Sequence, residues 1–275
     1  MTTCAIRVGL SRGLIELRQS FTNGAELFSH LLWPLLMLGA MWFMRDAEFA
    51  GTGLLLGTLA LPSILGMNVS FGMVSMSQLL TADREDGTLL RAKATPYGMT
   101  GYFTGKIVSV SGGLLADLAI FLVPGLLLID GLDLDAGAWL GLAWVVALGM
   151  VATLPIGAVL GSAFTSARAQ GLIQLPVIGM IAVSGIFYPV TALPEWLQWI
   201  AQVFPVYWLG LGMRSALLSA DAVSVEIGES WRQVETVGVL GAWAVLGLLV
   251  APVVPRRESG SSVAARRERA LQKVG

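Results

Sequence analysis

The sequence predicts an all-α integral membrane protein with six transmembrane helices. Of the 275 residues, 55% are hydrophobic and only 13% are charged, and the mean hydropathy is +0.75. A water-soluble domain carries about 25% charged residues, so this chain has too little polar surface to cover a soluble fold. Disorder requires low hydrophobicity, and a secreted disulfide scaffold requires more cysteines than the single Cys4. One His and one Cys also disfavour a metal site of the usual nitrogen and sulfur type.

Residues 1–26 precede the first apolar run and predict an amphipathic helix on the cytosolic membrane surface. Three arginines lie away from its apolar side and suit anionic lipid. The alternative is a soluble arm that packs on nothing. We expect no cleavable signal peptide, because no short apolar segment with a cleavage site comes first. The apolar side chains at helical spacing are Ile6, Leu10, Leu14, Leu17 and Phe21.

Six long runs are almost free of charged residues, and crossing the hydrocarbon core needs roughly 20 apolar residues. The runs are continuously apolar rather than alternating, which disfavours membrane strands. We therefore expect a six-helix transmembrane domain at 27–255, followed by a basic cytosolic tail at 256–275. The six runs are 27–44, 49–82, 107–129, 136–167, 169–194 and 236–255.

The distribution of positive charge disfavours a seventh span at 196–213. With six spans and both termini cytosolic, all of the 17 Lys and Arg residues except Arg45, Arg214 and Arg232 lie inside. A seventh span would move the cations of the tail outside, against the positive-inside rule. The aromatic segment 185–208 then predicts a partly re-entrant element on the outer face, between the fifth and sixth spans. Four of its aromatic residues suit a membrane–water boundary: Trp196, Trp199, Tyr207 and Trp208.

The loop between the second and third runs predicts a short cytosolic helix. Four consecutive charges precede Leu89 and Leu90, which are flanked by Arg91 and Lys93, and Pro96 ends the run. A run of charges is usually only a solvated loop. Here the apolar side and the position at a turn between two spans favour a docking role.

Asp117 lies near the middle of the third run, where an ionisable residue is costly and indicates function by default. The alternative is a protonated or hydrogen-bonded Asp inside the bundle, and both interpretations stay open. A proton relay would need several such groups, and no other span offers an Asp or Glu at depth. A proton-driven carrier is therefore disfavoured.

No pattern in the chain predicts catalysis. The stretch ending at Lys106 departs from the phosphate loop GxxxxGK[ST], because Thr100 replaces the first Gly and Ile107 follows the Lys. The Gly-x-Ser-x-Gly string at 9–13 has meaning only on a strand-to-helix turn, so we interpret it as chance. The lone His30 is too little for a zinc motif and disfavours an intramembrane hydrolase. We expect no enzymatic activity, no directly bound cofactor and no binding of nucleic acid.

Two stretches and the six-span layout resemble a known family. The first stretch has an acidic residue, a Gly-Thr pair and a later Pro: Arg84-Glu85-Asp86-Gly87-Thr88-Leu89, ending at Thr95-Pro96. The second runs from Ser184-Gly185-Ile186-Phe187-Tyr188-Pro189 through Leu193-Pro194-Glu195-Trp196-Leu197 to Phe204-Pro205. Together they resemble the permease subunit of bacterial ATP-binding-cassette (ABC) exporters of the type-2 class, the group that includes daunorubicin-resistance membrane subunits. The chain departs from the commonest pattern at Asp86 and in its more basic helix around Arg91 and Lys93.

This resemblance implies a dimer of two identical or related permeases, with cytosolic ATPase subunits that bind ATP and Mg. The segment 83–96 would be the coupling helix that docks on the ATPase, and the N-terminal helix would also touch it. The implied coupling residues are Asp83, Arg84, Glu85, Asp86, Gly87, Thr88, Leu89, Leu90 and Arg91. The substrate path would run between the two copies, along the second and fifth spans. Its implied residues are Asn68, Phe71, Met73, Met76, Gln174, Phe187 and Tyr188.

The expected function is export of a hydrophobic or amphipathic compound (a drug, an antibiotic or a lipid-like molecule) across a bacterial plasma membrane. The partners are then the ATPase, a second permease copy, membrane lipid and the hydrophobic small-molecule substrate. One alternative is a polysaccharide or glycolipid export permease of the same superfamily. Another is a membrane sensor or assembly subunit that transports nothing.

Overall fold

The computed structural model describes residues 2–48, 55–163 and 167–251, and in these ranges its regular structure is helical. Three short 3₁₀ helices, η1 (Val190–Ala192), η2 (Ala220–Val225) and η3 (Ile227–Glu229), accompany the α-helices. The α-helices are α1 (Thr2–Thr22), α2 (Gly24–Met44), α3 (Leu56–Glu85), α4 (Thr88–Lys93), α5 (Gly98–Leu128), α6 (Ala136–Ala163), α7 (Ala167–Val183), α8 (Glu195–Val203), α9 (Pro205–Leu217) and α10 (Gln233–Val250). The predicted tail at 256–275 lies outside the described residues.

Among the described residues, five helices are long and apolar enough to cross a membrane, namely α2, α3, α5, α6 and α10. The chain is therefore a multi-pass membrane protein, as expected. The predicted fifth span, 169–194, corresponds to α7, which has 17 residues and a shorter apolar part at Gln174–Val183. The predicted layout of six spans thus depends on α7, which is shorter than the five candidate spans.

Helix α3 is the centre of the bundle, since α5, α6, α7 and α9 all pack on it. In the most apolar stretch of 18 residues of α3, 72% of the residues are buried, against 22% in the corresponding stretch of α5. Small residues bring its neighbours close: a Cβ added to Gly66 would lie 2.7 Å from Gly210 of α9, and one added to Gly161 of α6 would lie 2.7 Å from the Ser77 carbonyl oxygen. Such close approach is typical of membrane helices, which pack through van der Waals contact rather than the hydrophobic effect.

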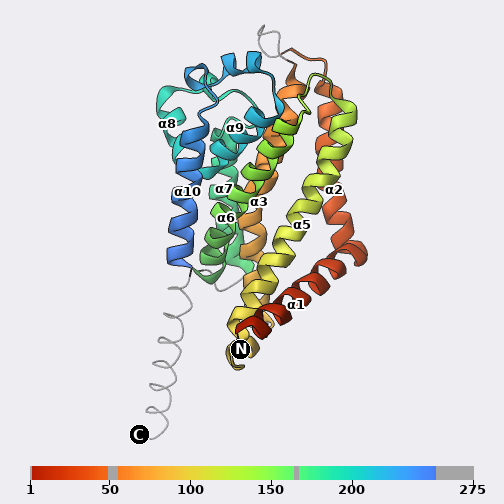
Figure 1. Cartoon of the computed structure of the whole chain (residues 1–275), viewed down its shortest axis with the longest axis vertical. Coiled ribbons are helices and arrows are strands. Elements are labelled where there is room, and N and C mark those ends of the chain that lie inside the picture. The colour runs from red at the N-terminus through yellow and green to blue at the C-terminus, as the bar shows by residue number, and fades with distance from the viewer. Residues whose placement is uncertain (1, 49–54, 164–166, 252–275) are drawn as a thin grey trace, which may run out of the picture.

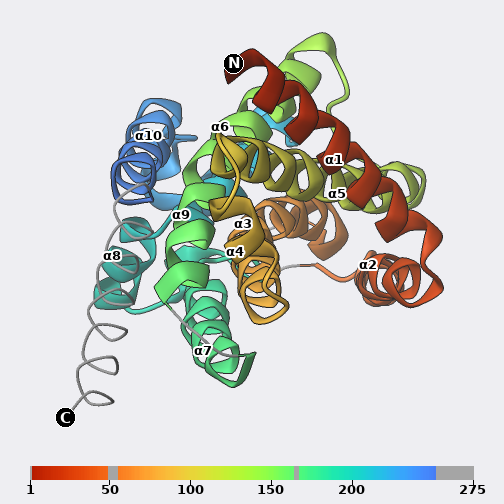
Figure 2. The ribbon, with the colours of Figure 1, turned by 90° about the horizontal axis from the view of Figure 1, so that it is seen from below.

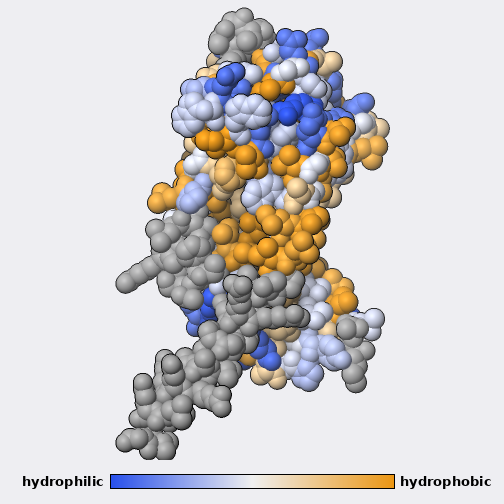
Figure 3. All heavy atoms as spheres, turned by 90° about the vertical axis from the view of Figure 1, so that its left-hand side faces the viewer, coloured by the Kyte–Doolittle hydropathy of each residue, from blue (hydrophilic) through white to orange (hydrophobic). Residues whose placement is uncertain are grey.

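The two ends of the bundle are built differently. Helices α1 and α4 lie at one end, which we call the α4 end, and α8 with the three 3₁₀ helices lies at the other, which we call the α8 end (Figure 1). Figure 2 shows, from below, that α1 crosses over α5 and reaches toward α2. Between the ends, Figure 3 shows apolar side chains gathered across the middle of one face. On α10, exposed apolar residues include Val237, Val245, Leu246, Leu248 and Leu249.

Helix α1 packs along α5, so the alternative of an arm without contacts is wrong. The helix ends at Thr22 rather than 26, because Asn23 caps α2 by accepting a hydrogen bond from the Ala25 amide. The predicted apolar side is divided. Ile6, Leu10 and Leu14 are 42%, 43% and 58% exposed, whereas Leu17 and Phe21 are partly buried against α5 and α2. An exposed apolar side on a helix with three arginines suits a membrane surface.

Helix α9 corrects the expectation for the aromatic segment. Tyr207 and Trp208, predicted at a membrane–water boundary, are 0% and 2% exposed, because α9 is enclosed by α3, α6 and α10. The other two predicted boundary residues, Trp196 and Trp199 of α8, are 62% and 71% exposed. Prolines limit α8 at both ends, with Pro194 before it and Pro205 starting α9.

Candidate functional site

The turn between α3 and α5 contains the predicted coupling residues. Gly87 takes φ 78°, a left-handed conformation that glycine adopts readily, and α4 begins at the next residue. The Thr88 amide donates to the Asp86 Oδ1 atom at 2.8 Å, and Arg91 donates to the Asp86 carbonyl oxygen at 3.1 Å. The hydrogen bond from Thr88 lowers the pKa of the Asp86 carboxyl below its ordinary value. The turn is thus held in one geometry.

Helix α4 has a buried side and an exposed side. Leu89 and Ala92 are 8% and 9% exposed and join a small apolar cluster that includes Leu80 and Tyr102. Leu90 is 66% exposed, and Arg91 is also on the surface. The predicted coupling residues are therefore not equivalent, because Leu89 anchors the helix whereas Leu90 and Arg91 face outward.

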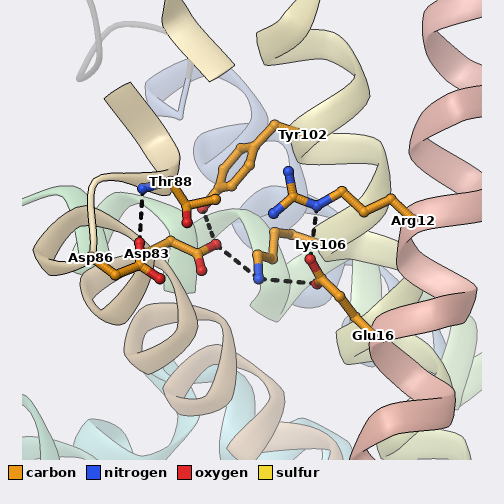
Figure 4. A network of polar contacts seen from close by, with 7 residues as sticks. All are labelled: Arg12, Glu16, Asp83, Asp86, Thr88, Tyr102 and Lys106. Atoms are coloured by element: carbon orange, nitrogen blue, oxygen red, sulfur yellow. Dashed lines mark hydrogen bonds and ion pairs between the residues drawn. The ribbon is translucent and has the colours of Figure 1, made fainter. Parts of the chain in front are cut away.

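Asp83 and Arg84 point into the protein rather than toward a partner. The Asp83 carboxylate accepts a hydrogen bond from the Tyr102 hydroxyl at 2.7 Å and pairs with Lys106 at 2.8 Å (Figure 4). Arg84 donates to the Ser162 carbonyl oxygen of α6 at 3.0 Å. These contacts tie the end of α3 to α5 and α6, while Glu85 is exposed.

Lys106 is the centre of a network that joins α1, α3 and α5, which we call the Lys106 network. It is 4% exposed, and its Nζ atom lies 3.0 Å from Glu16 Oε2 in addition to its contact with Asp83. Arg12 donates to the other Glu16 oxygen at 2.8 Å (Figure 4). Partial burial raises the pKa of Glu16, but the hydrogen bonds from Arg12 and Lys106 outweigh burial, so this pKa lies below its ordinary value. The sequence pattern indicates none of these pairings.

Glycines allow α1 and α5 to cross closely beside this network. A Cβ added to Gly13 would lie 2.5 Å from the Gly105 carbonyl oxygen, and one added to Gly9 would lie 2.8 Å from the Thr104 Cβ atom. The spacing of Gly9 and Gly13, repeated by Gly101 and Gly105, is the small-xxx-small pattern of closely packed membrane helices. This spacing is a signal that the sequence alone carries.

A second polar contact joins α2 and α5. The His30 Nδ1 atom lies 2.6 Å from Asp117 Oδ1, and its Nε2 atom lies 2.7 Å from the Ser20 hydroxyl of α1. The Phe21 ring stacks on His30 with 4.7 Å between centroids. Asp117 is therefore hydrogen-bonded, and with a side chain that is 32% exposed it lies at a cleft rather than deep in the bundle. His30 thus contacts both α1 and α5.

The predicted substrate-path residues do not form one surface within a single copy. Asn68 and Phe71 line a polar cleft of about 760 Å³ among α1, α2, α3 and α5, together with His30 and Asp117. Phe187 lines a separate cavity at the α8 end.

The remaining substrate-path residues have different surroundings. Met73 and Met76 are buried in the bundle at 2% and 1% exposure, Gln174 is exposed on α7, and Tyr188 lines the same cavity as Phe187. In the described ranges, no group of three or more His, Cys, Asp or Glu side chains is placed to hold a metal ion.

A family model described as ABC-2 type transporter matches residues 5–218. The matched region extends from α1 through α9 and contains the Lys106 network, α4 and every predicted coupling and substrate-path residue. No curated protein matches the chain.

Proposed function

The chain belongs to the ABC-2 type transporter family, and we propose that it is the non-catalytic permease subunit of an ATP-driven bacterial exporter. Its cargo is a hydrophobic or amphipathic compound such as a drug, an antibiotic or a lipid-like molecule. ATP and Mg bind to a separate ATPase subunit rather than to this chain. A daunorubicin-resistance-like role is the specific form of this proposal.

The observation that carries the proposal is that α4 has one side buried in the protein and one side exposed. A partner can drive a two-state bundle only if it contacts the two states differently. Helix α4 offers such a contact, because Leu90 and Arg91 face outward while Leu89 and Ala92 attach the helix to α3 and α5. The Lys106 network then extends the attachment to α1. Force applied at α4 therefore acts on three helices at once.

The α4 end faces the cytosol in this proposal. The positive-inside rule supports that orientation, because Lys and Arg gather at this end. Helix α7 then completes the six crossings as the fifth span in chain order. Both termini are cytosolic, and α8 with α9 forms the outer element. The described cations of α1, the end of α3, α4 and the start of α5 are Arg7, Arg12, Arg18, Arg84, Arg91, Lys93 and Lys106.

The cargo passes between two copies of the chain, along α3 and α7. Leu175 and Ile178 of α7 are 67% and 54% exposed, which leaves an apolar surface for lipid or for the second copy. Asn68 and Phe71 admit the cargo from the polar cleft. Phe187 and Tyr188 act nearer the outer face.

The experiment is efflux of daunorubicin from cells that co-express the chain with ABC ATPases encoded in its own genome. We expect Leu90→Glu and Arg91→Glu to abolish efflux and co-purification of the ATPase, with the permease still present in the membrane. The matched control is Leu134→Glu, because Leu134 is 46% exposed in the loop between α5 and α6. Normal efflux by the Leu90→Glu variant would contradict the coupling role.

Three further outcomes test the function itself. ATP hydrolysis by the purified chain alone would refute a separate ATPase. Purification with partners that include no ATPase would favour a sensor or assembly subunit. Export of a labelled lipid-linked sugar in place of daunorubicin would favour the polysaccharide or glycolipid alternative.

A further inference from the structure

The α8 end contains a buried ion pair at the opposite end of the bundle from the proposed coupling residues (Figure 1). Arg214 of α9 and Glu226 have side chains that are 3% and 2% exposed, and the Arg214 Nε atom lies 2.6 Å from Glu226 Oε1. The Arg214 Nη1 atom donates to the Ser63 hydroxyl of α3 at 2.9 Å and to the Gly185 carbonyl oxygen at 3.4 Å. Three separate segments of the chain therefore meet at one guanidinium group.

Each member of the pair keeps one atom without a hydrogen bond. Among the described residues, Arg214 Nη2 and Glu226 Oε2 are buried and have no partner. Buried polar atoms in folded proteins nearly always have partners, so each exception needs an explanation. One atom is a donor and the other is an acceptor, so a single small polar group that reached both would satisfy both. Both atoms are covered, so this group reaches them only after a small shift of the side chains around the pair.

An apolar cavity adjoins the pair. Its volume is about 220 Å³, and Arg214 and Glu226 are part of its wall. A cavity of roughly 150 Å³ with an apolar lining is enough to hold benzene. Helix α2 contributes three methionines to the wall, and methionine side chains adapt to apolar ligands of different shape. The apolar part of the wall includes Met37, Met41, Met44, Ile64 and Phe187.

We propose that this cavity binds the hydroxyl end of a neutral amphiphile, that is, an uncharged alcohol group on an apolar chain. The hydroxyl oxygen accepts a hydrogen bond from Arg214 Nη2, and the hydroxyl proton is donated to Glu226 Oε2. A carboxylate is excluded because it would face the charge of Glu226, and an ammonium group is excluded because it would face Arg214. The site lies within one copy of the chain. Its wall includes Phe187 and Tyr188 of the proposed cargo path, but the labelling test below measures binding without transport.

The test is photolabelling of the full chain in phosphatidylcholine nanodiscs, since this lipid has no free hydroxyl. The probes are octanol and octanoate that each carry a diazirine, at about pH 8, where a carboxylic acid is ionised. We expect octanol to label peptides that contain Met41, Ile64 or Phe187 roughly tenfold more than octanoate does. Equal labelling by the two probes, or labelling only outside the cavity, would overturn the proposal.

Two substitutions sharpen the test. Glu226→Gln leaves the charge of Arg214 without its partner, so we expect the preference to reverse toward octanoate. Ala60→Phe places a ring in the cavity from α3, and we expect it to abolish labelling by both probes. The matched control is Glu195→Gln, an exposed carboxylate on α8, which should label as the wild type does. An unchanged probe ratio in Glu226→Gln would overturn the proposal, and if this variant does not fold, Ala60→Phe and the wild-type ratio decide.

The natural hydroxyl could belong to a free alcohol or to a lipid headgroup, and competition distinguishes these sources. Unlabelled octanol and an unlabelled monoacylglycerol are added in separate arms. Displacement by octanol alone identifies a free alcohol, and displacement by the monoacylglycerol identifies a lipid headgroup. Displacement by neither, or by octane as effectively as by octanol, would show that no hydroxyl site exists.

Discussion

The two ends of the bundle each bury a cation, but they surround it differently. At the α4 end, Lys106 pairs with two carboxylates whose side chains are 23% and 13% exposed. At the α8 end, Arg214 pairs with Glu226 alone, and both are 3% exposed or less. In the first case each carboxylate has a second partner, Arg12 for Glu16 and Tyr102 for Asp83. The positive charge of Lys106 is therefore balanced by two carboxylates, whereas the positive charge of Arg214 is balanced by the Glu226 carboxylate alone.

This difference fits the roles proposed for the two ends. A region that receives work from a partner must exchange contacts without exposing a bare charge to an apolar surrounding. Lys106 can release one carboxylate while it keeps the other, so α1 and the α3–α4 turn can move relative to each other. Arg214 has no such freedom, and its pair instead fixes α3, α9 and the segment after α7. Movement is accordingly expected at the α4 end and rigidity at the α8 end.

The largest expected effect comes from Arg214→Met. Removing one member of a buried ion pair leaves the other charge uncompensated, which destabilises a protein by about 3–5 kcal/mol. We expect a loss of this size in thermal unfolding in detergent, and a partial recovery in the double variant Arg214→Met/Glu226→Met. The control is Arg45→Met, because the Arg45 side chain is 37% exposed and its ion pair is with Asp46, which is 85% exposed. A double variant that is less stable than Arg214→Met would contradict the isolated-pair description.

Lys106→Met is expected to have a smaller effect, although Lys106 is buried to a similar degree. Glu16 and Asp83 keep Arg12 and Tyr102 as partners, so the loss is about 2 kcal/mol, within the range for an unsatisfied buried group. The same unfolding measurement as for Arg214→Met checks this value. A loss as large as that of Arg214→Met would contradict the difference between the two ends, because it would show that Arg12 and Tyr102 do not compensate Glu16 and Asp83.

Gly13→Ala tests the crossing of α1 and α5 without changing any charge. The added Cβ would lie 2.5 Å from the Gly105 carbonyl oxygen, so α1 must shift away. Overpacking costs roughly 1–3 kcal/mol, and we expect the lower end because α1 lies on the outside of the bundle. Daunorubicin efflux should fall as well, since the contact of Glu16 with Lys106 is stretched. Gly39→Ala is the matched control, because a Cβ there meets nothing within 4 Å; an equal effect of both variants would exclude a role for the crossing.

Much of the helical layout could be predicted from hydrophobicity because each run is a local property. The run 27–44 corresponds to α2, and the prolines that limit α8 are visible in the sequence. The run 169–194 was too long as a helix prediction. Gly185 takes φ 71°, and the helix has already ended at Val183. Apolar composition continues through this turn, so composition alone does not show where the helix stops.

The pairings were beyond prediction for a different reason. Glu16 and Lys106 are 90 residues apart, and nothing local to either residue indicates its partner. Tyr207 and Trp208 show the same limit, because aromatic residues suit both a membrane boundary and a core, and only the packing of α3, α6 and α10 decides between them. The two glycine pairs of α1 and α5 are the exception, since their spacing could have predicted the crossing beside the network.

The smallest expected effect is the pH dependence that Glu16 adds to the α4 end. Its pKa in the folded protein lies below the ordinary value of 4.5, so its stabilising contribution is complete above that pH and is lost as the pH falls through the folded pKa. We expect wild type to exceed Glu16→Gln in thermal stability near neutral pH, and the difference to shrink as the pH falls below 4.5. Glu195→Gln, which changes an exposed carboxylate at the other end, should differ little from wild type throughout. A difference for Glu16→Gln that does not change with pH would mean that Glu16 contributes through packing alone, and Lys106 would then depend on Asp83 as Arg214 depends on Glu226.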